Sequence, residues 1–510
     1  MNIAGVRVFL SKVIKKPEFY FCLVFIILNL FFTRQILGVN GVGNFVFVGL
    51  IEVAIECASI FVLYKMRGRG EPLEKQFLFL ALVLGSLFII LLPPGQSPDD
   101  ITHFRRAYGI SQGVLVPDQV VNDKGAIGSL IPENTDFLSR RPDHGTYEMA
   151  AEELFEEKGE LSNQPYTSAA LYNFICYIPQ SIAALIGNIF GISVLGIAYL
   201  MDIFNFIVWV ILIYFAIKIT PRFKSIFLFV SLFPITLQEA TSVSPDALTI
   251  GLSFFLIAYI LYLAYEKKTQ MTKKDYVILS LCALVIGFCK IVYLPLIFLM
   301  IVIPKERFGT TKKKWIFLGV LLGAVIILNL AWLMFSSRYL VEYRTGVNSK
   351  EQLVGILKNP IKYLMVMFRT INVNGQLWMS NILGITLGAF TFNLPNALFF
   401  ISFAFSILLF MQRNETIKLK KADRWIFLLV FLMIIALIFT SLYMQWTPLG
   451  NDVIDGIQGR YFLPIIVLLP IILNRSNKKN YPVVISDVAV LYYSLFLNIV
   501  ACITVFAQNA

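Results

Sequence analysis

Residues 93–106 read PPGQSPDDITHFRR and stand where an apolar segment gives way to the longest polar region of the chain. The stretch brings together two adjacent carboxylates, a histidine and two arginines. Polar loops that follow a rigid apolar element are where binding and catalytic residues concentrate. We therefore analyse the rest of the chain by its relation to this stretch, the 93–106 motif.

The composition identifies the environment of the motif. Of the 510 residues, 58% are hydrophobic and 15% charged, and the mean hydropathy is +0.75. Repeated apolar runs of about 17–25 residues flanked by Lys or Arg are typical of membrane-spanning helices. The runs are continuous rather than alternating, which excludes a β-barrel. We predict an all-α integral membrane protein, a bundle of about 13 transmembrane helices whose external loops carry short interfacial helices.

The charge distribution predicts the orientation and excludes nucleic acid as a partner. The net charge is +12, but the basic residues gather in short loops that the topology assigns to one side, as in cytoplasmic loops. The region 93–166 carries 6 Lys/Arg against 13 Asp/Glu, which does not suit a polyanion. We expect a multi-pass protein of a bacterial cytoplasmic membrane, in contact with the lipid bilayer, with a cytoplasmic N-terminus and the motif outside.

The predicted organisation has three parts. Residues 1–75 form an N-terminal transmembrane hairpin and a cytoplasmic loop, residues 76–475 form the membrane core, and residues 476–510 form a C-terminal helix. The core contains the external region 93–166 and a second external region, 336–394. In the hairpin, Glu52 and Glu56 are spaced i,i+4 on one helix face. They are either functional intramembrane carboxylates or a hydrogen-bonded pair that faces the bundle.

Counting membrane crossings restricts the middle of the chain. An odd number of spans must connect the external region to the basic loop at 266–274, yet four apolar segments lie between them. We predict that 168–190 lies at the outer interface without crossing, because Pro179 and polar residues interrupt it. The segments 193–217, 225–238 and 250–265 then cross. Further on, 276–289 and 291–303 form a short hairpin with Lys290 at its outer tip.

This topology gathers polar residues from distant parts of the chain on the outer face. They are Asp99, Asp100, His103, Arg105, Arg106, Asp246, Lys290, Asp452, Asp455, Arg460 and Tyr461. A carboxylate there can act as general base on a hydroxyl, cations can hold a departing phosphate, and apolar grooves can hold a lipid tail. Nucleotide sugars are absent outside the cytoplasm, so a sugar donor at this site would be a polyprenyl phosphate sugar.

Structural explanations compete with this interpretation. Ser97-Pro98-Asp99-Asp100 has the form of a helix start with Ser97 as N-cap, and Ser244-Pro245-Asp246 has the same form. Asp99 and His103 are spaced for a simple i,i+4 ion pair. Arg105 and Arg106 could contact lipid head groups, and Arg460 could snorkel. The six cysteines form no CxxC pair, and only two histidines are present, so a Cys/His metal site is not expected.

Four segments carry a resemblance to a known family: PPGQSPDDITHFRRAYGISQG (93–113), VSPDAL (243–248), GFCKIVYLPL (287–296) and GIQGRYFLP (456–464). They resemble a family of predicted bacterial multi-pass membrane proteins catalogued as a domain of unknown function. That family is similar in layout to the GT-C glycosyltransferases, which use polyprenyl-linked donors. The resemblance covers about residues 75–475. The family has Asp-Glu more often where this chain has Asp99-Asp100, so either acid could be the base.

The resemblance implies a GT-C-type membrane glycosyltransferase that moves a sugar, with inversion, onto a glycan, cell-wall polymer or other envelope acceptor. Asp99 or Asp100 would be catalytic. The expected substrate-binding residues are His103, Arg105, Arg106, Asp246, Lys290, Asp452, Arg460 and Tyr461. A divalent cation (Mg or Mn) is required by some GT-C enzymes and not by others. The alternatives are a transporter or flippase of lipid-linked saccharides, a polysaccharide polymerase or ligase, and a non-catalytic scaffold.

Overall fold

The structure is a computed structural model and describes residues 17–117, 119–120, 127–336, 345–412, 419–473 and 485–510. Within these residues, 8 helices are long and apolar enough to cross a membrane. They are α2 (Pro17–Val39), α3 (Phe45–Gly68), α4 (Leu73–Leu91), α8 (Val194–Ile219), α11 (Asp246–Leu261) with the π-helical turn η4 (Tyr262–Glu266) that continues it, α14 (Thr311–Ser336), α18 (Lys421–Gln445) and α21 (Asp487–Asn509). The protein is an all-α, multi-pass membrane protein, as the sequence predicts.

Several of the about 13 predicted spans form shorter segments, so within the described residues 8 helices have spanning length. The region 225–238 is broken into α9 (Lys224–Ser231) and α10 (Pro234–Ala240), and the last predicted re-entry into α19 (Leu463–Ile466) and α20 (Leu468–Leu473). Pro234, Pro464 and Pro470 lie at these breaks, where proline removes a backbone donor. The remaining short segments are α12 (Lys273–Cys289), the 3-10 helix η5 (Ile291–Val302) and α17 (Ala397–Met411).

The segment 168–190 contains no helix long enough to span. It forms two 3-10 turns, η2 (Ala169–Leu171) and η3 (Phe174–Tyr177), followed by the 12-residue helix α7 (Ile178–Ile189). A straight helix of that length is about 18 Å long, well short of a bilayer core. The structure agrees with the prediction that this segment does not cross. Helix α7 packs against α8 and against the helix that follows the 93–106 motif.

The external region contains a small sheet that the sequence did not predict. Its helices are α5 (Asp100–Ser111) and α6 (Thr146–Glu153), with a 3-10 turn η1 (Asp136–Ser139) between them. Strands β1 (Gln119–Val120), β2 (Ile127–Pro132) and β3 (Leu161–Pro165) form an antiparallel sheet in the order β1-β2-β3. The strands are short and lack an alternating apolar pattern, so nothing in the sequence identifies them.

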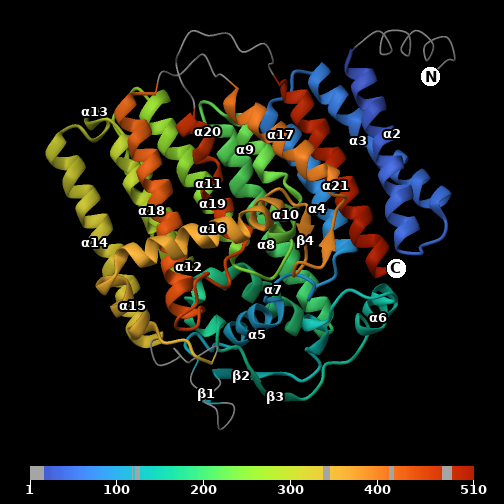
Figure 1. Cartoon of the computed structure of the whole chain (residues 1–510), viewed down its shortest axis with the longest axis horizontal. Helices are drawn as coiled ribbons and strands as arrows, with labels where there is room; N and C mark the ends of the chain where they lie inside the picture. Colours follow the sequence, from blue (N-terminus) through green and yellow to red (C-terminus); the bar gives the residue numbers. More distant parts are fainter. Residues whose placement is uncertain (1–16, 118, 121–126, 337–344, 413–418, 474–484) are drawn as a thin grey trace.

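The second external region contains α15 (Ser349–Lys358), α16 (Pro360–Ile382) and the short hairpin β4 (Thr386–Leu387) and β5 (Phe392–Asn393). Figure 1 shows α16 lying across the bundle, whereas α18 runs along it. The far end of α16 reaches the centre of the molecule.

The two predicted sides lie at opposite ends of the bundle. In Figure 1 the basic turn α13 (Lys305–Phe308) is at the top, and α5 and the three-stranded sheet are at the bottom. The basic residues of 1–16 and 474–484, which also support the predicted orientation, lie outside the described residues. The C-terminal helix α21 is the most buried of the long helices and packs against α2, α4 and α9.

The N-terminal hairpin α2–α3 encloses its two carboxylates. Glu52 accepts a hydrogen bond from Thr33 Oγ1 at 2.7 Å, and Glu56 accepts one from Asn29 Nδ2. All four side chains are buried. Both carboxylates thus have a hydrogen-bond partner on α2, as the second interpretation of Glu52 and Glu56 expects.

Candidate functional site

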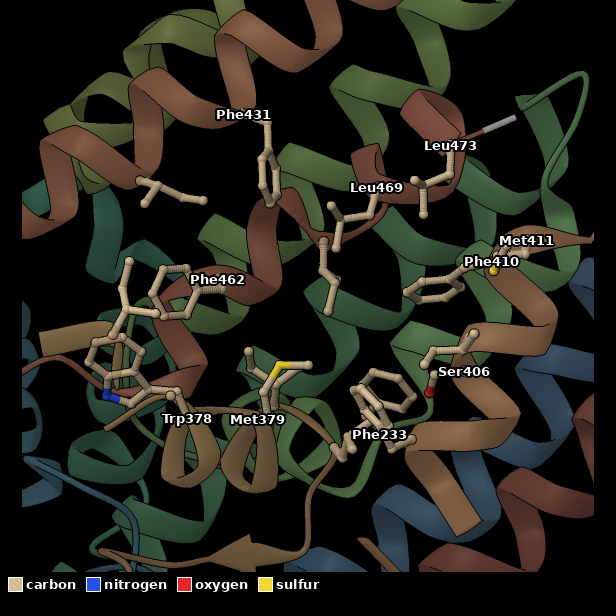
Figure 2. Close-up of a pocket in the computed structure, with 18 of the residues that line it drawn as sticks. Phe233, Trp378, Met379, Ser406, Phe410, Met411, Phe431, Phe462, Leu469 and Leu473 are labelled. Atoms are coloured by element: carbon tan, nitrogen blue, oxygen red, sulfur yellow. The ribbon is translucent and has the colours of Figure 1, made fainter. Parts of the chain in front are cut away.

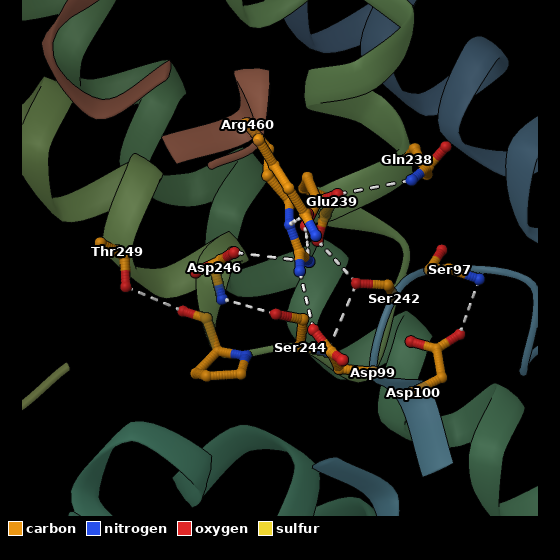
Figure 3. A network of polar contacts seen from close by, with 12 residues as sticks. Ser97, Asp99, Asp100, Gln238, Glu239, Ser242, Ser244, Asp246, Thr249 and Arg460 are labelled. Atoms are coloured by element: carbon orange, nitrogen blue, oxygen red, sulfur yellow. Dashed lines mark hydrogen bonds and ion pairs between the residues drawn. The ribbon is translucent and has the colours of Figure 1, made fainter. Parts of the chain in front are cut away.

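The centre of the candidate site is the Arg460 side chain, which is only 4% exposed. Its Nη2 donates to Asp99 Oδ2 at 2.9 Å, and its Nη1 donates to Glu239 Oε2 at 3.3 Å and lies 3.7 Å from Asp246 Oδ2. Figure 3 shows these three acids, from the 93–106 motif, α10 and the start of α11, arranged around one guanidinium. Tertiary folding thus joins segments more than 350 residues apart in the sequence.

Lys290 extends this group of charges. Its Nζ lies 2.5 Å from Asp246 Oδ1 and 4.9 Å from the centroid of the Tyr461 ring. The backbone carbonyl of Tyr461 accepts a hydrogen bond from Tyr293 at 2.8 Å. We call Asp99, Glu239, Asp246, Lys290, Arg460 and Tyr461 the Arg460 cluster. It contains two cations and three carboxyl groups, so nearly all of its charge is compensated internally.

The end of α16 holds the segment that carries Arg460. Asn381 Oδ1 accepts the backbone N–H of Arg460 at 3.1 Å, and Trp378 Nε1 donates to the carbonyl of Ile457 at 2.9 Å. At Gly459 an added Cβ would lie 2.5 Å from the carbonyl oxygen of Trp378, so only glycine fits. Gly459 thus allows this segment to pack closely against α16, and that packing orients Arg460.

Asp99 and Asp100 are adjacent in the sequence but have different surroundings. Figure 3 shows Asp99 directed toward Arg460 and Asp100 toward Ser97. Asp100 is buried, and its Oδ2 accepts the backbone N–H groups of Gly95 at 3.0 Å and Ser97 at 3.1 Å. The Asp99 side chain is 59% exposed, and its backbone is left-handed, with a φ of 67°. Left-handed backbone at a residue other than glycine is strained and concentrates at functional sites.

The predicted capping role of Ser97 is wrong. Helix α5 begins at Asp100 with Asp99 in the cap position, and neither Ser97 nor Asp99 makes a side-chain cap. Instead of Ser97 accepting a backbone N–H, the Asp100 side chain accepts the backbone N–H of Ser97. At the second site, Ser244 Oγ does accept the N–H of Asp246 at 3.2 Å, so local turn geometry and membership of the cluster coexist there.

The two aspartates also differ in protonation. Burial raises the pKa of Asp100 to about 8, although two backbone N–H groups oppose the shift. Burial acts on Asp99 in the same direction, but the Arg460 guanidinium, with help from His103 and Lys290, brings its pKa below the ordinary value. At neutral pH Asp99 is therefore ionised, while Asp100 is mostly protonated.

His103 does not form the predicted ion pair with Asp99. Its Nδ1 pairs with the hydroxyl of Tyr177 at 2.7 Å, and its ring meets the edge of Tyr172 at 5.7 Å between centroids. Burial lowers the pKa of His103 to about 4, against the attraction of Asp99 and Asp246. The imidazole is neutral at physiological pH and forms the side of the cluster nearest α7.

Arg105 and Arg106 are not part of the cluster. Arg105 donates to Thr135 Oγ1 at 2.8 Å and lies 3.7 Å from Asp136. Arg106 donates to the backbone carbonyls of Val114 and Leu115 at 3.1 and 2.7 Å. Both side chains are buried, so they do not reach lipid head groups, and their hydrogen bonds tie the external region together. The expectation that they bind substrate has no support in this geometry.

Asp452 is also separate from the cluster. It pairs with Arg369 of α16 on the surface, where both side chains are 59% exposed. Conversely, Glu239 belongs to the cluster but was not among the predicted site residues. It is fully buried within α10. The available signal was an acidic residue just after the apolar run 225–237, seven residues before Asp246.

The described residues do not form a metal site. No three His, Cys, Asp or Glu side chains within the described ranges are close enough to share an ion. The carboxylates of the Arg460 cluster are instead bonded to Arg460 and Lys290. This donor set does not fit a divalent cation, and we derive no step through one.

An apolar cavity of about 550 Å³ is lined in part by Phe462, two residues after Arg460 in the chain. Figure 2 shows its lining, with Trp378 and Met379 of α16 below, Phe410 and Met411 of α17 at one side, and Leu469 and Leu473 of α20 above. Phe462 and Ile466 line it as well. The segment that begins with Arg460 and Tyr461 thus passes directly from the charged cluster to the wall of the cavity.

Comparison with known proteins assigns the chain to a family. No curated protein and no solved structure matches it. The model of a family described as predicted membrane protein (DUF2142) matches residues 82–469, about three quarters of the chain. The match includes every residue of the Arg460 cluster and omits α2, α3 and α21. With most of its length matched, the chain belongs to the DUF2142 family of predicted membrane proteins.

Proposed function

We propose that this protein is a membrane glycosyltransferase of GT-C type, which transfers a sugar from a polyprenyl phosphate donor to a cell-envelope acceptor outside the bacterial cytoplasmic membrane. One observation carries the proposal: a charged cluster and an apolar cavity adjoin through one short segment, with Arg460 on one side and Phe462 on the other. A ligand that matches both has an anionic head and a long hydrocarbon tail. A polyprenyl phosphate has this composition.

The cavity supports the tail of such a donor. Its lining is almost entirely hydrocarbon and aromatic, and includes residues of α16, α17, α18 and α20. Burial of apolar surface contributes about 25 cal/mol per Å² removed from water, and the cavity offers no polar group that a tail would leave unsatisfied. The phosphate would then lie near Arg460 and Lys290, the two cations of the cluster.

The arrangement supports Asp99 rather than Asp100 as the general base. Asp99 is exposed and ionised. Asp100 is buried and mostly protonated, and it is hydrogen-bonded to the backbone N–H groups of Gly95 and Ser97. In the reaction, the acceptor hydroxyl attacks the anomeric carbon and its proton passes to Asp99. The bond between that carbon and the phosphate oxygen breaks, and the polyprenyl phosphate leaves as an anion beside Arg460 and Lys290. A single displacement of this kind inverts the anomeric centre.

The buried acids have a different task in this mechanism. Glu239 and Asp246 hold Arg460 and Lys290 in place before the donor arrives. Cations that are already oriented need no reorganisation when charge develops on the leaving phosphate, which is the condition for effective electrostatic stabilisation. Asp99 is the only exposed carboxylate among the three that contact Arg460, so the donor and acceptor would approach from its side.

The test is chemical analysis of the cell envelope. A strain that lacks the gene is complemented with wild type, Asp99→Asn, Asp100→Asn or the double variant Glu52→Gln/Glu56→Gln, and its envelope polymers are examined by mass spectrometry. We expect one sugar substituent to disappear in the deletion strain. Wild type and the double variant should restore it, because Glu52 and Glu56 lie in the separate α2–α3 hairpin. Asp99→Asn should not.

Other outcomes would favour the alternatives. Restoration by Asp99→Asn together with failure of the Glu52/Glu56 variant would reject the transferase and favour a transporter of lipid-linked saccharides. Restoration by every variant would favour a scaffold. A change in polymer length rather than in a substituent would indicate a polymerase or ligase, which would use the same chemistry on a larger acceptor.

A further inference from the structure

The loop between α10 and α11 carries the two buried acids of the Arg460 cluster, one at each end. It runs from Thr241 to Pro245, between Glu239 and Asp246, and has no regular secondary structure except for bends. All of its residues are buried. Buried irregular backbone in a membrane protein must find hydrogen-bond partners elsewhere, since neither lipid nor neighbouring turns supply them.

Two amide side chains supply these partners. Asn205 of α8 donates from Nδ2 to the carbonyl of Ser242 at 2.7 Å and to that of Ser244 at 2.8 Å. Gln180 of α7 donates from Nε2 to the carbonyl of Val243, between them, at 3.1 Å. Three consecutive carbonyls are thus held from two different helices, and both amides are almost completely buried.

The loop transmits this anchoring to the charged groups. Ser242 Oγ donates to the carbonyl of Glu239 at 3.2 Å, and Ser244 Oγ accepts the N–H of Asp246 at 3.2 Å. Figure 3 shows Ser242 and Ser244 beneath Arg460, beside Asp99. A displacement of the loop would therefore move Glu239 and Asp246 together, and with them the partners of Arg460 and Lys290.

We propose that Asn205, assisted by Gln180, is a positioning residue that sets the geometry of the Arg460 cluster by holding the Ser242–Ser244 backbone. Its importance for sugar transfer rests on the proposed function, but the geometric effect does not. Neither residue touches a charged side chain of the cluster through any of these hydrogen bonds. They act through the loop.

The chain offers a closely matched control. Asn498 of α21 is also fully buried, and its Nδ2 donates to two backbone carbonyls, those of Leu232 and Ser494, each at 2.7 Å. Asn498→Leu therefore removes the same number and kind of hydrogen bonds as Asn205→Leu. The two variants differ in whether the freed carbonyls belong to the loop between Glu239 and Asp246.

The experiment measures the exposure of Lys290 directly. Purified wild type, Asn205→Leu and Asn498→Leu are treated with a small amine-acylating reagent, acetic anhydride, and the acylated fraction of each lysine is read by peptide mass spectrometry. Lys314 is an internal reference, because it is buried and held by the carbonyls of Ile301 and Ile303 far from the loop. Sugar transfer is measured in membranes from the same strains.

We expect Lys290 to be acylated severalfold faster in Asn205→Leu, with Lys314 unchanged and with neither lysine changed in Asn498→Leu. Transfer should fall by about 100-fold in Asn205→Leu, the effect of misplacing reacting groups by about 1 Å. Equal acylation of Lys290 in wild type and Asn205→Leu, or an equal rise in Asn498→Leu, would overturn the inference. If Asn205→Leu does not fold, Gln180→Leu, which frees one carbonyl, replaces it under the same criteria.

The same data separate this inference from the proposed function. Faster acylation of Lys290 in Asn205→Leu, combined with normal activity of Asp99→Asn, would support the positioning role and reject the transferase mechanism. Unchanged acylation of Lys290, combined with loss of activity in Asp99→Asn, would do the reverse.

Discussion

Replacing Arg460 by methionine should destabilise the protein far more than the loss of a typical ion pair. Methionine has a similar length but no charge, so Glu239, fully buried, and Asp246 would lose a cation at 3.3 and 3.7 Å. At an effective dielectric constant of 20, the gross attraction at 3.3 Å is about 5 kcal/mol. Removing one partner of a buried pair costs about 3–5 kcal/mol net, since the remaining charge stays buried. The contact with the exposed Asp99 adds little to this sum.

Thermal unfolding of the detergent-purified protein measures this cost. An unfolding entropy of about 2.1 cal/mol/K per residue corresponds, for 510 residues, to a fall in Tm of roughly 3–5 °C. Arg369→Met is the matched control, because Arg369 pairs with Asp452 on the surface and should cost about 1 kcal/mol or less. Adding Glu239→Gln to Arg460→Met removes the orphaned charge and should recover part of the loss. Equal Tm values for the two single arginine variants, or a further fall in the double variant, would refute the argument.

Three further predictions concern the motif and the cavity. Asp100→Asn should retain transfer within about tenfold of wild type, because an amide oxygen can accept the N–H groups of Gly95 and Ser97. Asp100→Leu should lower the free energy of unfolding by about 1–3 kcal/mol for each N–H left unsatisfied. Equal Tm values for the two variants would contradict this. His103 has a pKa of about 4 in the folded protein and an ordinary value of 6.5 when unfolded, so stability should fall by about 3 kcal/mol as the pH drops through that interval. Denaturant unfolding at several pH values should show a shallower fall for His103→Gln, and an unchanged slope would count against a buried neutral imidazole. Gly375→Trp should abolish transfer while the protein still folds, since a side chain there enters the apolar cavity and its Cβ meets only Ile371 at 3.9 Å. The control is Gly355→Trp on α15, where a Cβ meets nothing within 4 Å. Equal transfer by both variants would argue against the cavity as a donor site.

The membrane architecture could be predicted because its causes are local. Runs such as α8, α11 and α18 are long, apolar and flanked by charged residues, and the cost of unpaired backbone in lipid leaves helix as their only form. The lack of a helix of spanning length in 168–190 also followed from local interruptions. The helix breaks in 225–238 and after Leu463 were harder to predict from the sequence. Proline is tolerated in the first turn of a helix, so its presence does not by itself show that a span is divided. The short strands β1 to β3 depend on pairing between residues far apart and have no pattern of their own.

In the candidate site, too, some features could be predicted from the sequence and others depended on tertiary contacts. Asp99, Asp246, Lys290, Arg460 and Tyr461 could be selected from sequence, because charged groups at predicted membrane boundaries are few and costly. Their pairing could not, since Arg460 bonds to Asp99 across 361 positions and to Glu239 across 221. For the same reason the sequence could not separate Arg105 and Arg106 from the cluster. They lie close to Asp99 in the sequence, but their side chains donate to Thr135 and to the carbonyls of Val114 and Leu115.

The sequence by itself determined the class of the protein, the presence of many apolar helices, and most of the residue types that form the Arg460 cluster. Hydropathy and charge are properties of each segment, and they can be read without knowing which segments pack against one another. Only the tertiary structure decided which of two adjacent aspartates is exposed and ionised, which acids surround Arg460, and that an apolar cavity adjoins them. Those properties depend on burial and on distances of 3–4 Å between segments, which packing sets after every helix has formed.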